Sequence, residues 1–151
     1  MKIVLVKRDT LFCLSTYYTQ QMDDRLKQLY QDVILVHSKN PFQYEKKEDS
    51  SFHLEANNPI CGDRFQFYFE VENGKIKDCH FHGHGCAISK AASSILTQNI
   101  IGKDLEEVIS YCSKMEEVID PNAEASNPDS ELLAFEAARH FPERAACATL
   151  S

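Results

Sequence analysis

A stretch in which apolar residues alternate with polar ones constrains the fold of this chain most. Residues 65–71 place Phe or Val at every second position, a period of two that is typical of a strand with one buried face. Asn73-Gly74 follows, and this dipeptide is the strongest short-range signal for a tight hairpin because both residues tolerate positive φ. The return strand is predicted over residues 75–82, and a shorter alternating strand around residues 52–56 precedes the hairpin.

Much of the remaining chain follows the spacing of amphipathic helices, with apolar residues three and four positions apart. The predicted helical stretches are residues 22–39, 86–101, 105–119 and 132–140. Asp104 is the expected N-cap of the third stretch, and Pro142 is expected to interrupt the chain before residues 144–147. Strands early and helices late indicate an α+β domain, with a three-stranded antiparallel sheet covered on one side by helices.

Length and charge narrow the class of protein. The chain has 151 residues, of which 43% are hydrophobic, enough for one domain with one core. It carries 16 Lys and Arg against 23 Asp and Glu and no long basic run, so we expect no nucleic acid as partner. Charged residues at positions 7–9 interrupt the apolar start, so we expect no membrane span and a cytoplasmic location. Residues 1–21 are expected to be an N-terminal extension, and residues 22–151 the domain.

Cysteines at three turns of this layout are the first candidates for chemistry. The spacing of the six Cys lacks the density of a disulfide scaffold, so free thiols in a reducing compartment are expected. Cys61, Cys86 and Cys147 lie where predicted elements meet, and Asp63 follows the first of them closely. Three thiolates and one carboxylate suit tetrahedral zinc. The alternative is that these Cys are buried thiols, since free Cys is commonly buried and the spacing alone forms no motif.

Histidines before Cys86 form a second candidate site. His80, His82 and His84 alternate on an extended segment with Cys86 beyond them, so alternation would direct all four to one face as metal ligands. The alternative is an exposed strand edge that carries polar His without binding a metal. His37 is expected to pack on or cap its helix. The remaining Cys are interpreted as part of the extension, the core strand and the core helix, at Cys13, Cys79 and Cys112.

Three short segments resemble the signatures of one protein family when they are taken together and in order. They read NPICGD at 58–63, GHGCAIS at 83–89 and RAACATL at 144–150. These segments are similar to the SufU and IscU family of iron–sulfur cluster assembly proteins, and the helix LYQDVILVHSKNP at 29–41 resembles the opening helix of that family. The resemblance covers about residues 22–151 and implies the SufE/IscU-like fold.

Within this family, the chain resembles the SufU branch more than the IscU branch. It carries the additional loop and helix around residues 117–135, and Ala146 stands where the IscU branch usually has His. The resemblance therefore implies a zinc ion held by four residues, with Arg144 as a neighbouring basic residue of the reaction. The four implied ligands are Cys61, Asp63, Cys86 and Cys147.

The resemblance also implies a function and its partners. In the SufU branch a pyridoxal-phosphate cysteine desulfurase of the SufS type passes persulfide sulfur to the smaller protein, and Cys61 matches the acceptor. Assembly scaffolds or client proteins would receive that sulfur. The alternative is an IscU-like scaffold that builds a transient iron–sulfur cluster on the same Cys and hands it to clients. A third alternative is a structural zinc domain without sulfur transfer.

Overall fold

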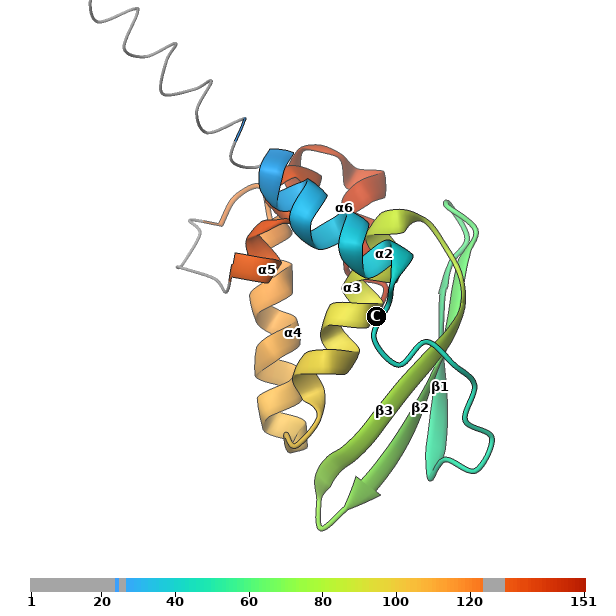
Figure 1. Cartoon of the computed structure of the whole chain (residues 1–151). Helices are drawn as coiled ribbons and strands as arrows, with labels where there is room; N and C mark the ends of the chain where they lie inside the picture. Colours follow the sequence, from blue (N-terminus) through green and yellow to red (C-terminus); the bar gives the residue numbers. More distant parts are fainter. Residues whose placement is uncertain (1–23, 25–26, 124–129) are drawn as a thin grey trace, which may run out of the picture.

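Helices cover one face of a three-stranded antiparallel sheet in this protein (Figure 1). The structure is a computed structural model that describes residues 24, 27–123 and 130–151. The strands are β1 (Phe52–Asn58), β2 (Asp63–Glu72) and β3 (Lys75–His84), and they lie in the order β1-β2-β3. The predicted α+β class and three-stranded sheet are therefore confirmed.

The central hairpin forms where the sequence predicts it. Asn73 and Gly74 have φ values of 53° and 74°, the left-handed conformation that a tight hairpin turn requires. Phe65, Phe67 and Phe69 all turn toward the helices and are at most 9% exposed. Together with β3 and the last turn of α3 they form the core between sheet and helices.

Helix α3 (Ala87–Ile100) joins the sheet to the other helices. Its small residues, Ala91, Ala92, Ser93 and Ser94, are each at most 1% exposed, so neighbouring elements approach its backbone closely. Helix α4 (Leu105–Ile119) follows and begins with the predicted N-cap. The Asp104 side chain accepts from the Glu107 N–H, and the Glu107 side chain accepts from the Asp104 N–H, which is a capping box.

The first described helix contains a segment of π-helix. It comprises η1 (Tyr30–Leu35) and α2 (Val36–Lys39) and ends before Pro41. The predicted helix is confirmed from residue 27 to residue 39, and its predicted start at Met22 lies outside the described residues. His37 packs on α3, where its Nδ1 lies 2.8 Å from Ser94 Oγ.

The predicted continuous helix over residues 132–140 is wrong. The chain forms the short helix α5 (Ser130–Leu133) and the 3-10 helix η2 (Glu136–His140). Leu132, Phe135 and Ala138 are all buried, and their spacing of three suits a 3-10 helix better than an α-helix. Pro142 begins a helix instead of interrupting one, because it occupies the first turn of α6 (Pro142–Ala148), where its missing N–H costs nothing.

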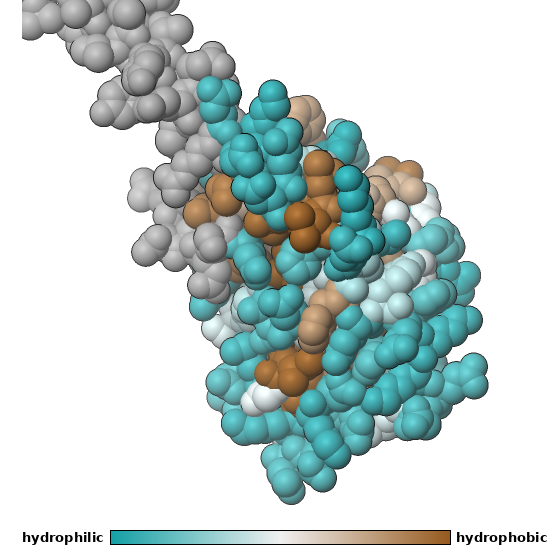
Figure 2. Space-filling view, viewed as in Figure 1, coloured by the Kyte–Doolittle hydropathy of each residue, from teal (hydrophilic) through white to brown (hydrophobic). Residues whose placement is uncertain are grey.

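None of the described helices is both long and apolar enough to cross a membrane. Hydrophilic side chains cover most of the face shown in Figure 2, with apolar side chains gathered in smaller areas.

Candidate metal centre

The turn between β1 and β2 presents Cys61. Asn58 and Asp63 face each other as the last pair of the β1–β2 ladder, and residues 59–62 connect them. The Asn58 side-chain oxygen accepts from the Ile60 N–H at 3.2 Å, an Asx turn that fixes the start of this connection. Gly62 has a φ of 72°, which favours glycine and lets the chain reverse into β2. Cys61 is left exposed while Asp63 is only 2% exposed.

Cys86 caps the N-terminus of α3. Its Sγ accepts from the Ser89 N–H at 3.4 Å, and the Ser89 hydroxyl donates to the Cys86 carbonyl at 3.1 Å. Space beside it is tight, because a Cβ on Gly85 would lie 2.6 Å from Ser89 Oγ and 2.7 Å from ring atoms of Phe65. Only glycine at position 85 lets β3 turn into α3 this close to β2.

Helix α6 brings Cys147 to the same place. Cys147 is 1% exposed, and its Sγ lies 3.1 Å from Cys61 Sγ. The Asn58 side-chain amide donates to Cys147 Sγ at 3.5 Å. The turn after β1 and the last helix of the chain therefore meet at these two sulfurs.

The structure brings three of the four sequence-predicted ligands into one cluster. Sulfur or oxygen atoms of Cys61, Asp63 and Cys147 all lie within 4.8 Å of one another. Cys86 lies beside them, since its N–H donates to Asp63 Oδ1 at 2.8 Å. The other carboxylate oxygen, Asp63 Oδ2, is buried and has no hydrogen-bond partner, which is costly for a charged group unless a cation is present.

This donor set fits zinc. Thiolate sulfur and carboxylate oxygen are among the ligands that zinc takes, at about 2.3 Å and 2.0–2.2 Å. Burial, followed by the neighbouring Cys61, Asp63 and Cys86, raises the pKa of the Cys147 thiol far above its ordinary value. Without a cation, this thiol therefore stays protonated at neutral pH. A bound cation would stabilise its thiolate and satisfy the free carboxylate oxygen.

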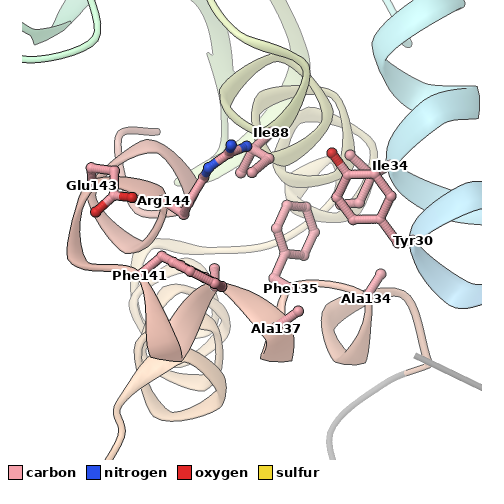
Figure 3. A pocket seen from close by; sticks show the side chains of 10 residues that line it. Tyr30, Ile34, Ile88, Ala134, Phe135, Ala137, Phe141, Glu143 and Arg144 are labelled. Carbon is pink, nitrogen blue, oxygen red and sulfur yellow. The ribbon is translucent and has the colours of Figure 1, made fainter. Parts of the chain in front are cut away.

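An apolar cavity of about 320 Å³ lies next to the cluster. Figure 3 shows Phe135, Ile34 and Ile88 in its lining, together with Arg144. The cavity and the cluster meet at Glu143 of α6. Glu143 lines the cavity, and its backbone carbonyl accepts a hydrogen bond from the Cys61 thiol at 3.9 Å. Arg144, the implied basic residue, thus lines a cavity at the edge of the cluster.

The histidines of β3 do not form a metal site with Cys86 among the described residues. His80 is 7% exposed, so it is not on an exposed edge either. Its Nε2 lies 2.9 Å from Asp78 Oδ2 and its Nδ1 3.1 Å from Glu45 Oε1. His82 instead stacks on Tyr44, with ring centroids 5.1 Å apart. These side chains fasten the loop of residues 41–51 to the outer face of the sheet.

Asp78 is the carboxylate that both Lys47 of this loop and His80 of β3 contact. Burial favours its neutral form, but hydrogen bonds from Lys47 and His80 outweigh burial and hold the pKa of its carboxyl well below the ordinary value. Lys47 Nζ lies 2.7 Å from Asp78 Oδ2, and the same hydrogen bond raises the pKa of Lys47. This group is a structural ion-pair cluster rather than part of the metal centre.

The other cysteines lie apart from the cluster. Cys79 is fully buried in β3, and burial raises the pKa of its thiol to about 12. Cys112 on α4 is partly exposed rather than a core residue as predicted, and burial raises its thiol pKa as well. Cys13 lies outside the described residues.

Sequence reasoning missed two polar residues that contact the cluster, Asn58 and Ser89. The Asn-Pro dipeptide at positions 58–59 is a recognisable signal for a turn. It does not reveal the contact with Cys147, which lies 89 residues further along the chain.

Comparison with known proteins decides the family. The sequence model of the protein family described as the NifU-like N-terminal domain matches residues 29–148. The chain belongs to this family. That range includes all four residues of the candidate metal centre, and the predicted relationship to SufU and IscU is confirmed.

The relatives that match this chain include both a SufU and an IscU protein. The chain is 35% identical over 127 residues to the zinc-dependent sulfurtransferase SufU of Bacillus subtilis, covering 83% of this chain and 86% of that protein. It is also 35% identical over 130 residues to the iron–sulfur cluster assembly scaffold protein IscU of Streptococcus pyogenes, covering 84% and 80%. Sequence identity alone therefore does not separate the two functions.

Solved structures support the same fold. A SufU from Fervidobacterium islandicum, described as a scaffold protein for the SUF system, superposes with a TM-score of 0.73 at 31% identity, covering 82% of this chain and 90% of that one. A NifU-like N-terminal domain from Brucella abortus has a TM-score of 0.69 at 21% identity, covering 81% of this chain and 88% of that one, and shows the shared fold alone.

Proposed function

We propose that this protein serves iron–sulfur cluster assembly as a zinc-bound sulfur acceptor and carrier, with Cys61 as the sulfur acceptor. Cys61, Asp63, Cys86 and Cys147 hold the zinc. The observation that carries this proposal is the buried Asp63 oxygen without a partner, which lies within a cluster that also contains two thiols. When bound, zinc supplies positive charge that keeps the thiols deprotonated.

Differences in exposure among the three thiols support Cys61 as the reacting group. Cys61 is exposed, Cys86 is partly exposed and Cys147 is buried. An incoming persulfide meets Cys61 first, since it lies on a turn that projects from the end of the sheet. Cys147 lies within α6 and Cys86 is the N-cap of α3, so both remain in place while Cys61 reacts.

The transfer step is an exchange between sulfur atoms. The Cys61 thiolate attacks the outer sulfur of a persulfide carried by a cysteine of the partner, and a new S–S bond forms on Cys61. The S–S bond of the partner's persulfide breaks, and its cysteine leaves as a thiolate. Arg144 lines the neighbouring cavity, where its positive charge would attract an anionic group of the partner.

The persulfide donor that fits this step is a pyridoxal-phosphate cysteine desulfurase of the SufS type. The recipients of the sulfur are assembly scaffolds or client proteins. With a net charge of -7, the chain favours partners that present a basic surface.

The test is cysteine turnover by such a desulfurase, with a reductant present, with and without the zinc-loaded protein. We expect strong stimulation by the wild type and none by Cys61→Ser. Cys112→Ser is the matched control, because Cys112 is a partly exposed thiol on α4 that is not part of the cluster, and this change should leave stimulation unchanged. In a parallel reaction without reductant, which would otherwise remove the persulfide sulfur as sulfide, mass spectrometry should find one added sulfur atom on Cys61.

Two results would contradict the proposal. Stimulation that survives in Cys61→Ser would show that another group accepts the sulfur. Equal loss of folding in Cys61→Ser and Cys147→Ser, seen as equal falls in melting temperature, would favour a structural zinc domain.

The second candidate function is a scaffold for an iron–sulfur cluster. The similarity to IscU of Streptococcus pyogenes favours it, whereas Ala146 in place of the usual His favours the carrier. Purification without air separates the two. A brown protein with a thiolate-to-iron absorption band supports the scaffold, and a colourless protein that contains zinc supports the carrier.

A further inference from the structure

The three thiols of the candidate metal centre differ in the hydrogen bonds that they receive. Cys86 Sγ accepts from the Ser89 N–H at 3.4 Å and lies 3.5 Å from the Ser89 hydroxyl. Cys147 Sγ accepts from the Asn58 amide at 3.5 Å. Among the described residues, Cys61 Sγ receives a hydrogen bond from no group except the Cys147 thiol, and that proton is lost when Cys147 becomes a thiolate.

The orientation of the Asn58 amide is fixed by its other contact. Its oxygen accepts from the Ile60 N–H at 3.2 Å, so its NH₂ group must face Cys147. Asn58 is 6% exposed, which leaves water little room to replace either contact. One side chain thus shapes the turn that carries Cys61 and donates a hydrogen bond to Cys147.

We propose that Asn58 is a positioning residue that keeps Cys147 as a permanent zinc ligand and thereby leaves Cys61 as the thiolate that reacts. A donated hydrogen bond stabilises a thiolate and lowers its nucleophilicity, and donors around metal ligands strengthen metal binding. Ser89 has the same effect on Cys86. This inference rests on the proposed function, because it concerns the zinc that the carrier would hold.

Two substitutions separate the donor role from the role in the turn. Asn58→Ser keeps an oxygen that can accept from the Ile60 N–H, but its side chain is too short to donate to Cys147. Asn58→Asp also keeps the acceptor and places a carboxylate oxygen against the Cys147 sulfur. Asn57→Ser is the control, since Asn57 is exposed and its side chain contacts Glu55 instead.

The measurement is the zinc dissociation constant of the full chain, obtained by competition with a chromophoric chelator, together with the melting temperature of each metal-free protein. We expect zinc affinity to fall about tenfold in Asn58→Ser and up to about a hundredfold in Asn58→Asp. Asn57→Ser should bind zinc as the wild type does. The metal-free melting temperatures of the Ser variants should stay close to that of the wild type.

Each alternative outcome has a definite meaning. Wild-type affinity in both Asn58 variants would overturn the inference and leave Asn58 as a residue of the turn only. A wild-type protein that does not bind zinc would overturn the proposed carrier, and this inference with it. If Asn58→Asp does not fold, Asn58→Ser alone decides the question.

Discussion

Gly85 offers a sharp test of how closely the sheet must approach α3 to place Cys86. A Cβ at this position would lie 2.6 Å from Ser89 Oγ and 2.7 Å from Cε2 and Cζ of Phe65. Phe65 is fully buried and packs edge-on against Phe81, with ring centroids 5.8 Å apart. The ring therefore has little room to move, and Gly85→Ala must displace the backbone that leads into Cys86.

The cost of this displacement follows from the packing. Overpacking a buried site by one methyl group costs about 1–3 kcal/mol in the free energy of unfolding, a large part of the roughly 5–15 kcal/mol that stabilises a domain. Zinc sites require ligand distances within about 0.2 Å. A shift of the Cys86 backbone by a few tenths of an ångström should therefore weaken zinc binding as well.

Gly74→Ala is the matched control. Gly74 has a φ of 74° and no atoms near its missing Cβ, so alanine there costs about 1–2 kcal/mol of backbone strain far from the metal centre. Urea unfolding of the metal-free proteins and chelator competition for zinc measure both quantities. We expect Gly85→Ala to lose stability and zinc affinity together, and Gly74→Ala to lose stability alone. A Gly85→Ala protein with wild-type zinc affinity would refute the reasoning.

Two further predictions use the pKa values of described side chains. Asp78→Asn should lower the free energy of unfolding by roughly 1–3 kcal/mol at pH 7, because hydrogen bonds from Lys47 and His80 outweigh burial and depress the pKa of Asp78. The stabilisation by the Asp78 carboxylate is fully present above the ordinary Asp pKa of about 4 and is lost as pH falls through the lower pKa of the folded protein. Urea unfolding should therefore show a smaller difference in stability between wild type and Asp78→Asn at pH 3 than at pH 7. A difference of the same size at both pH values would argue against the ion pair of Asp78 with Lys47. Cys79, whose pKa burial raises to about 12, should remain unlabelled by iodoacetamide at pH 8 while Cys61 of the metal-free protein is fully modified. Labelling of both at similar rates, read by peptide mass spectrometry, would mean that β3 opens readily.

Features set by local sequence were predicted best. The hairpin at Asn73-Gly74 and the N-cap at Asp104 each depend on residues close together in the chain. The sheet follows from the alternation around Phe67, because one face of an antiparallel sheet is buried and the other is not.

Features set by tertiary packing were not predicted. The break after Leu133 depends on burying Phe135 against the other helices, and the apolar spacing fits a continuous helix equally well before that packing is known. The contacts of His80 with Asp78 and Glu45 could not be predicted without the position of the loop over the sheet. Likewise, the cysteines gave no motif by spacing, and family resemblance was needed to group them.

The meeting of Cys61 and Cys147 sets an order of events during synthesis of the chain. These two residues are 86 positions apart, and Cys147 belongs to the last helix of the described chain. The turn that carries Cys61 is made early, yet the three-residue ligand cluster cannot exist until α6 has left the ribosome and docked. A nascent chain that holds the completed hairpin therefore lacks this cluster, and uptake of the metal would report that the final helix is in place.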